Sequence, residues 1–185
     1  MPAKAQRHAG QVRIIGGEYR RRILHFPDQA GLRPTPDRVR ETLFNWLGQE
    51  LQGMNCLDAF AGSGALGFEA ASRHAARVVM LESSRQACDA LKQNRQLLKA
   101  DWVDIQQAEA LGWMRSASER FDLIFLDPPF ASGLAGQALA LAAGLLKPQG
   151  WIYVEQPERV AAPEGFIIHR EGRAGQSRFA LLRRG

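Results

Sequence analysis

The sequence has little of what marks secreted, membrane-embedded or metal-binding proteins. Its two cysteines, Cys56 and Cys88, form no Cys-x-x-Cys pair and are too few for a disulfide framework, so we expect a reduced, cytoplasmic setting. No apolar run approaches the ~20 residues of a transmembrane helix. Residues 1–10 lack the apolar segment of a signal peptide. The four histidines are scattered without the spacing of metal ligands, so no metal site is expected.

Lysine is also scarce, because only four of the 24 basic residues are lysine and the rest are arginine. Residues 1–40 hold nine basic and three acidic residues, and residues 166–185 hold five and one. The segment 41–165 between them is acidic, with ten basic and fifteen acidic residues. Arginine binds phosphate through a planar fork, and neutralising phosphates releases counterions. The basic ends therefore predict a nucleic-acid partner.

The 185 residues fit one compact unit of the α/β class. From residue 56 onward, short apolar strands alternate with helices, which predicts a mostly parallel, doubly wound sheet. A terminal strand pair with a glycine-rich turn closes the chain. No coiled-coil pattern appears, and we expect a monomer. Strands are predicted at 56–60, 77–82, 103–107, 121–127, 151–155, 166–170 and 178–182, and helices at 65–73, 84–99 and 134–146.

The first fifty residues precede this alternation and read as a separate extension. Residues 12–15 and 19–24 predict a β-hairpin that turns at Gly16-Gly17, since glycine tolerates positive φ. Thr35-Pro36 predicts a helix start, with threonine as the N-cap and proline as the first helical residue. Apolar residues then recur at helical spacing as far as Gly48. We therefore divide the chain into an extension over 1–50 and a main domain over 51–185.

A glycine-rich loop joins the first predicted strand of the main domain to its helix. Gly62, Gly64 and Gly67 match G-x-G-x-x-G, and Glu82 ends the next strand. Glycines let a ligand approach the backbone, the helix N-terminus offers free N–H groups, and the carboxylate can accept both hydroxyls of a ribose. The loop predicts a nucleotide-type cofactor. It fits a nicotinamide dinucleotide and S-adenosylmethionine equally well.

The turn Asp127-Pro128-Pro129-Phe130 decides between these cofactors. It follows a buried strand, so it lies at the ligand-binding edge of the sheet, beside the glycine loop. The prolines remove two N–H donors, which leaves the Asp127 carboxylate and the Pro128 carbonyl as acceptors beside the ring of Phe130. A base stacked on Phe130 could donate both amine hydrogens to these acceptors, which directs the nitrogen lone pair at the methyl group of S-adenosylmethionine. A nicotinamide enzyme has no use for a turn that offers only hydrogen-bond acceptors.

Four stretches together resemble the class I S-adenosylmethionine-dependent methyltransferases, and more closely the bacterial RsmD-type family that methylates guanine N2 in 16S rRNA. They are Arg13–Gly17, Leu32–Trp46, Leu57–Gly67 and Leu126–Phe130. The resemblance covers the chain from about Val12 to Leu182. It implies a Rossmann-like, seven-stranded sheet with a reversed C-terminal hairpin. It also implies methylation of the guanine at position 966 of the rRNA, in an assembled or assembling small subunit.

The same resemblance implies roles for individual residues. Asp127, Pro128 and Phe130 would hold the target base, while Gly62 and Gly64 would hold the methionine end of the cofactor and Glu82 its ribose. Gln107 stands where such enzymes commonly carry Asp or Asn toward the adenine. The full set of expected cofactor residues is Asp58, Phe60, Gly62, Gly64, Glu82, Gln107 and Ala108, and the expected RNA contacts are Arg20, Arg21, Arg22, Arg33 and Arg38.

Three other functions fit parts of the sequence. An adenine-N6 methyltransferase acting on DNA or RNA can use the same kind of turn as Asp127-Pro128, although 185 residues leave no room for a separate DNA-recognition domain. A nicotinamide oxidoreductase would explain the glycine loop alone. A non-catalytic RNA-binding protein on an enzyme fold would require that the cofactor is not bound. Neither cysteine suits covalent attack on a base.

Overall fold

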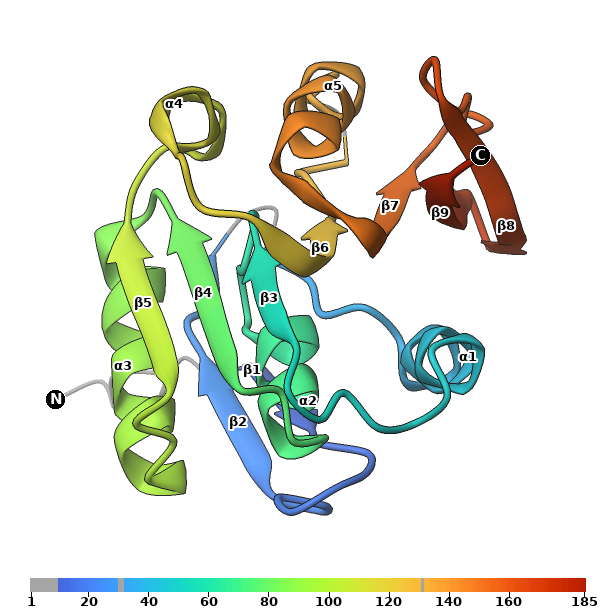
Figure 1. Cartoon of the computed structure of the whole chain (residues 1–185). Coiled ribbons are helices and arrows are strands. Elements are labelled where there is room, and N and C mark those ends of the chain that lie inside the picture. Colours follow the sequence, from blue (N-terminus) through green and yellow to red (C-terminus); the bar gives the residue numbers. More distant parts are fainter. Residues whose placement is uncertain (1–9, 30–31, 131) are drawn as a thin grey trace, which may run out of the picture.

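The computed structural model describes residues 10–29, 32–130 and 132–185. A seven-stranded sheet forms its centre, with strand order β5-β4-β3-β6-β7-β9-β8 (Figure 1). The first five of these strands run parallel, and β9 and β8 form a reversed antiparallel hairpin at the edge. This confirms the predicted fold class. The strands are β3 (Asn55–Asp58), β4 (Arg77–Glu82), β5 (Val103–Gln107), β6 (Phe121–Leu126), β7 (Leu146–Gln156), β8 (Phe166–Ala174) and β9 (Ser177–Arg184).

Helices cover both faces of the sheet, as expected for a doubly wound fold (Figure 1). One face packs on α1, α2 and α3, and the other packs on α4 and α5. Alternate residues of each buried strand enter the two cores, so Phe125 faces the first core and Ile124 the second. The helices are α1 (Asp37–Trp46), α2 (Ala65–Ser72), α3 (Arg85–Leu98), α4 (Ala110–Ser116) and α5 (Ala135–Leu145).

The N-terminal extension forms a small sheet of its own, in which β1 (Gly10–Arg13) pairs with β2 (Ile23–Phe26). The predicted N-terminal hairpin is confirmed, but its predicted turn at Gly16-Gly17 and its predicted strand bounds, 12–15 and 19–24, are wrong, because the strands are joined by the longer segment 14–22. The two glycines instead approach helix α2. A Cβ on Gly17, whose φ is +78°, would lie 2.0 Å from the carbonyl oxygen of Ser72. These glycines therefore fasten the extension to the main domain.

A buried ionic cluster completes this attachment. Glu69 on α2 is fully buried and accepts hydrogen bonds from the backbone N–H groups of Ile15 and Gly16, both at 2.9 Å. Arg40 on α1 and Arg73 after α2 also bind its carboxylate, at 3.3 and 3.0 Å. One carboxylate thus joins the extension, α1 and α2. The extension shares the first hydrophobic core, and the boundary expected at residue 50 stays a prediction.

We expect Glu69→Gln to lower the free energy of unfolding by about 3–5 kcal/mol, since removing one member of a buried ion pair leaves the others uncompensated. The amide keeps the shape of the side chain but cannot balance two arginines. Chemical denaturation of the variant beside Glu41→Gln, an exposed position on α1, measures the difference. Equal stability of the two variants would contradict the role assigned to Glu69.

Three other elements differ from the prediction. Helix α4 was not expected, because it has only seven residues and contains Gly112. Strand β7 begins at Leu146 instead of residue 151. Gly172 was expected in the terminal turn but lies within β8 opposite Phe179, where a Cβ would approach the phenyl ring to 2.5 Å.

Candidate active site

The candidate site lies where β3, β4, β6 and β7 end. Parallel strands bring their carboxyl ends to one edge of the sheet, and in such folds ligands bind outside that edge. Each of these strands carries a carboxylate at its end or within one residue of it: Asp58, Glu82, Asp127 and Glu155. Asp58, Glu82 and Asp127 were predicted as site residues, and the structure brings them to this edge.

The glycine loop between β3 and α2 has the open backbone that a bound cofactor needs. Gly62 and Gly64 take φ values of +54° and +85°, a region that favours glycine, and helix α2 begins directly after Gly64. The N–H of Gly62 donates to Glu82 Oε2 at 2.9 Å, so the loop is fixed to the end of β4. A side chain on Gly64 would collide with Phe68 and Leu91.

Asp58 lies under this loop with one oxygen unused. Its Oδ2 accepts the N–H of Gly67 at 3.0 Å, whereas Oδ1 is buried and has no partner among the described residues. Burial raises the pKa of Asp58 to about 7, and the Gly67 N–H offsets this only in part. A buried acceptor without a donor is costly, so a ligand that brings an ammonium or hydroxyl donor would be stabilised here. The residues present therefore fit the amino-acid end of S-adenosylmethionine.

Glu82 is half-buried, and both of its oxygens accept backbone N–H groups. Oε2 binds Gly62 and Oε1 binds Ser84, at 2.9 and 3.0 Å. A carboxylate has about four acceptor positions, so about two remain for the hydroxyls of a ribose. The hydrogen-bond acceptors of the site, with Glu82 at one end and Asp58 at the other, suit an adenosine joined to an amino acid.

The end of β5 provides fewer contacts for an adenine than we expected from the sequence. The N–H of Ala108 donates to the carbonyl of Glu82 at 3.0 Å and is not available to an adenine. The Gln107 side chain is exposed. Phe60 and Ala108 are half-buried and pack against the second core, where they leave apolar surface. The cofactor roles of Gln107, Ala108 and Phe60 stay predictions, with Ala108 limited to apolar or carbonyl contacts.

Asp127 stands directly after β6, and its contacts fix the turn that follows. Pro128 is buried, whereas the ring of Phe130 is 54% exposed and offers a face to a ligand. Asp127 Oδ2 accepts a hydrogen bond from Thr35 Oγ1 at 3.0 Å. Burial and the nearby charge of Glu155 hold the pKa of Asp127 well above its usual range, while the Thr35 hydrogen bond lowers it.

Thr35 was predicted as the N-cap of α1, and this prediction is wrong. Pro36 occupies the cap position, no side chain caps the helix, and the first helical residue is Asp37. The hydroxyl of Thr35 bonds to Asp127 instead, 92 residues away in the chain. Local sequence thus identified the helix start within two residues but not the function of the threonine.

Thr35 belongs to a segment, here called the strap (residues 27–29 and 32–36), that crosses the carboxyl edge of the sheet. Gln29 Oε1 accepts from Ser84 Oγ at 3.1 Å, just after β4. Leu32 covers the glycine loop, since a Cβ on Gly62 would lie 3.1 Å from its methyl group. Thr35 then reaches Asp127. The strap therefore contacts the ends of β4, β3 and β6 in turn.

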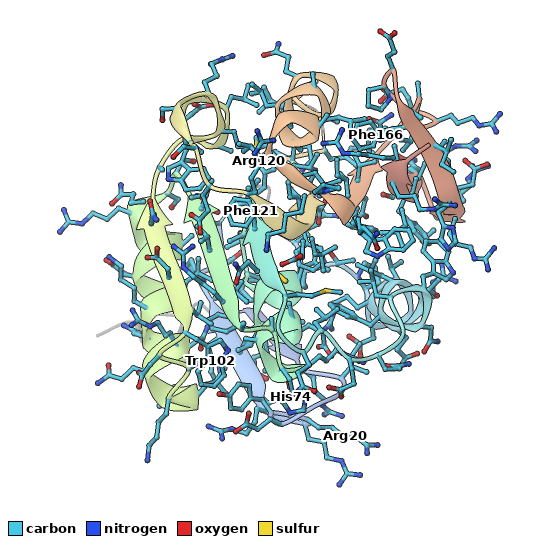
Figure 2. All side chains as sticks on the ribbon, viewed as in Figure 1. Arg20, His74, Trp102, Arg120, Phe121 and Phe166 are labelled. Atoms are coloured by element: carbon cyan, nitrogen blue, oxygen red, sulfur yellow. The ribbon has the colours of Figure 1, made fainter. Side chains whose placement is uncertain are left out.

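The expected RNA contacts separate into two groups. Arg33 and Arg38 are exposed on the strap and the first turn of α1, on either side of Thr35, which bonds to Asp127. Arg20, Arg21 and Arg22 lie at the other end of the sheet, where the Arg22 guanidinium bonds to the carbonyl of Leu97 near the end of α3. Figure 2 shows Arg20 at the lower end of the molecule, away from the carboxyl ends of the strands.

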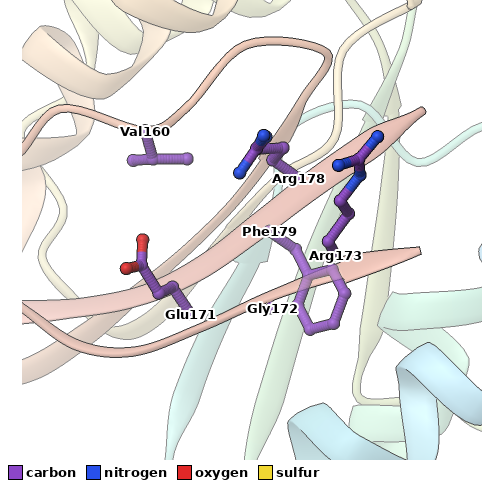
Figure 3. Close-up of a pocket in the computed structure, with 6 residues that line it drawn as sticks. All are labelled: Val160, Glu171, Gly172, Arg173, Arg178 and Phe179. Carbon is purple, nitrogen blue, oxygen red and sulfur yellow. The ribbon is translucent and has the colours of Figure 1, made fainter. Parts of the chain in front are cut away.

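A shallow hollow of about 230 Å³ lies at the tip of the β8–β9 hairpin (Figure 3). Arg173 and Arg178 stand directly opposite each other there, an arrangement that is unfavourable for like charges unless an anion lies between them. Arg178 pairs with Gln156 at the end of β7, which places this hollow at the same sheet edge as Asp127. The sequence predicted that the C-terminal segment is basic, but not that Arg173 and Arg178 lie at the same sheet edge as Asp127.

The residues that the structure describes contain neither a metal-ligand cluster nor a membrane-spanning helix. No group of three or more His, Cys, Asp or Glu side chains in that part of the chain could hold a metal ion. None of the helices described there has the length and apolarity needed to span a bilayer.

Sequence similarity to known proteins identifies the family of this chain. The family model described as conserved hypothetical protein 95 matches residues 12–183. Ribosomal RNA small subunit methyltransferase D of Escherichia coli K12 is 42% identical over 185 residues, covering 95% of this chain and 91% of that protein. The chain belongs to this RsmD-type family.

Other members of the family extend the likeness to a second organism and to a solved structure. The protein of the same name from Haemophilus influenzae is 42% identical over 174 residues, covering 90% of each chain. The solved structure of a candidate methyltransferase of E. coli, yhhF, superposes with a TM-score of 0.87 at 42% identity. It covers 95% of this chain and 98% of that one. The chain thus has the fold of this methyltransferase family over nearly its whole length.

Proposed function

We propose that this protein transfers a methyl group from S-adenosylmethionine to the exocyclic N2 amine of a guanine in 16S rRNA, at position 966. One observation carries the proposal. An acceptor-only turn, Asp127-Pro128, is held in place by Thr35 at the sheet edge that also bears the glycine loop and the unpartnered oxygen of Asp58. The names of the related enzymes support the reaction and the rRNA substrate.

Asp58, Gly62, Gly64 and Glu82 would hold the cofactor, with Leu32 of the strap over the glycine loop. When bound, S-adenosylmethionine supplies an electrophilic methyl carbon on a positively charged sulfur. Asp58 Oδ1 would accept the donor of the amino-acid end, and Glu82 would accept the ribose hydroxyls. The strap would then exclude water from the reacting groups.

Asp127 and Pro128 would orient the nucleophile. The target amine would donate one hydrogen to the Asp127 carboxylate and the other to the Pro128 carbonyl, with the base stacked on Phe130. The nitrogen lone pair then forms a bond to the methyl carbon as the carbon–sulfur bond breaks. The amine proton passes to Asp127 and from there to water, so Asp127 must be ionised when the reaction begins.

Radiolabelled methyl transfer tests the proposal. Small ribosomal subunits from a strain that lacks this enzyme are incubated with the protein and labelled S-adenosylmethionine, and duplex DNA is incubated in parallel. We expect label in 16S rRNA and none in DNA. Label in duplex DNA alone would contradict the proposal and favour the adenine-N6 alternative. Calorimetry with NAD(H) and, separately, with S-adenosylmethionine tests the oxidoreductase alternative. We expect heat of binding only with S-adenosylmethionine.

We propose that the substrate is the rRNA in the small subunit or its assembly intermediate, that the protein acts as a monomer, and that it acts where subunits assemble, in the cytoplasm. The arginines of the strap and of the first turn of α1 would bind this RNA most tightly. Arg33 and Arg38 lie on either side of Thr35, which bonds to Asp127, so phosphates next to the target guanine would meet them first. Arg20, Arg21 and Arg22 could touch only RNA that reaches the far end of the sheet.

Charge reversal distinguishes these two groups of arginines. We expect Arg33→Glu with Arg38→Glu to weaken binding to small subunits and to reduce the slope of log K against log salt by about 2, since each phosphate contact contributes about 0.9. The matched double variant, Arg20→Glu with Arg21→Glu, should change the slope less. Binding is measured by filter retention at several salt concentrations. A larger change in the Arg20 and Arg21 variant would contradict the placement of the RNA.

A further inference from the structure

Two carboxylates stand side by side where the target base would enter. Leu126 of β6 pairs with Val154 of β7, so the residues that follow them, Asp127 and Glu155, come next in register. The backbones of neighbouring strands lie about 4.8 Å apart. Their side chains share one face of the sheet. The residues two positions earlier, Phe125 and Tyr153, both lie in the first core.

Glu155 is oriented by neutral donors and not by a cation. Its Oε1 accepts from Ser177 Oγ at 2.7 Å and its Oε2 accepts from the Tyr153 hydroxyl at 3.0 Å. No arginine, lysine or histidine among the described residues forms an ion pair with Glu155 or Asp127. Both carboxylates are half-buried and keep acceptor positions that no cation among the described residues neutralises, so a ligand with hydrogen-bond donors would satisfy them.

The Watson–Crick edge of guanine supplies such donors in one row. The N1–H lies beside the N2 amine, so a base whose amine reaches Asp127 brings its N1–H toward the neighbouring carboxylate. Adenine carries an unprotonated N1 beside its amine, and that lone pair would face a carboxylate and be repelled. Asp127 and Glu155 together thus favour guanine, whose N1 carries a hydrogen, over adenine, whose N1 does not.

We propose that Glu155 accepts the N1–H of the target guanine and thereby makes the enzyme select guanine over other bases that carry a reactive amine. The inference rests on the proposed function and adds selection among bases, which the Asp127-Pro128 turn cannot provide. That turn recognises any exocyclic amine, whereas Glu155 recognises the atom next to it. Tyr153 and Ser177 act as positioning residues, because they hold the Glu155 carboxylate toward the site.

An analogue of guanine tests this directly. 2-Aminopurine keeps the N2 amine but lacks O6 and has an unprotonated N1, so it retains the reacting atom and loses the proposed contact. 16S rRNA carrying guanine or 2-aminopurine at the target position is made by ligation and reconstituted into small subunits. Single-turnover methylation by the native protein should be about 10- to 100-fold faster on guanine, the range for a hydrogen bond to a charged group.

The variant Glu155→Gln separates recognition from the intrinsic reactivity of the two bases, which is the same for both enzymes. The glutamine amide can donate to an unprotonated N1, so the preference for guanine should fall to within about threefold. Glu158→Gln, an exposed position three residues further along, should keep the native preference. Binding of S-adenosylmethionine, measured by calorimetry, verifies that both variants are folded.

The outcomes distinguish the inference from the proposed function. If the native protein methylates neither subunit, the proposed function fails. If it methylates both bases at similar rates, the proposed function stands and the role of Glu155 is overturned. An unchanged guanine preference in Glu155→Gln that still binds S-adenosylmethionine overturns it as well. Should the variant not fold, similar rates of the native protein on the two bases would still overturn the inference.

Discussion

Asp127→Ala is expected to slow methyl transfer by about a thousandfold or more, because it removes both the acceptor that orients the amine and the group that takes its proton. Binding of S-adenosylmethionine should change little, because the proposed cofactor contacts, Asp58, Glu82 and the glycine loop, are kept. Single-turnover rates on small subunits and calorimetry with S-adenosylmethionine measure the two effects separately.

A second substitution divides the two roles of Asp127. Asp127→Asn keeps a carbonyl that accepts one amine hydrogen but cannot take up a proton, so its rate should fall between those of the native protein and the alanine variant. Asp101→Ala, an exposed aspartate just before β5, serves as the control and should leave the rate unchanged. Near-native activity of Asp127→Ala would refute the amine-acceptor role.

Thr35→Val should reduce the rate at neutral pH by about 10- to 100-fold, the cost of one hydrogen bond to a charged group. The shape of the side chain is kept, and only the hydroxyl that donates to Asp127 is lost. Thr35→Ser restores the hydroxyl and should recover most of the activity.

The pH profile distinguishes this role of Thr35 from a purely structural one. Asp127 must be ionised to act, so activity falls as the pH drops through its pKa. Burial and the charges of Glu155 and Asp58 raise this pKa, and the Thr35 hydrogen bond lowers it. Removing that bond raises the pKa further, and the acidic limb of the rate profile should move to higher pH. The limb of Thr35→Ser should stay in place, and an unmoved limb in Thr35→Val would contradict the assignment.

The parts of the site that follow one another in the chain could be predicted from the sequence. A strand, a glycine loop and a helix are consecutive, so Gly62, Gly64 and the carboxylate of Glu82 were recognisable from spacing. The Asp127-Pro128 turn was recognisable for the same reason, because proline restricts its own backbone and removes its own donor whatever surrounds it. The alternation of strands and helices also fixed the doubly wound sheet.

The residues that reach the site through tertiary structure were not predictable in this way. Glu155 stands beside Asp127 only because β7 lies next to β6 in the sheet order, and nothing local distinguishes it from other glutamates. Thr35 has the local sequence pattern of a helix cap, but its hydroxyl donates to the distant Asp127 carboxylate and does not cap the helix. Gly16 and Gly17 were expected to make a turn, but the close approach to helix α2 is what requires glycine there.

Mass spectrometry of the nucleosides released from 16S rRNA tests the central claim most directly, since it identifies the base and the methylated atom together. Small subunits that lack the modification are treated with the protein and S-adenosylmethionine, then digested and compared with untreated subunits. We expect one new N2-methylguanosine per 16S rRNA, from the fragment that contains position 966. N6-methyladenosine in its place, or a guanine methylated on a ring nitrogen, would contradict a site in which Asp127 and Pro128 hold the exocyclic amine of guanine.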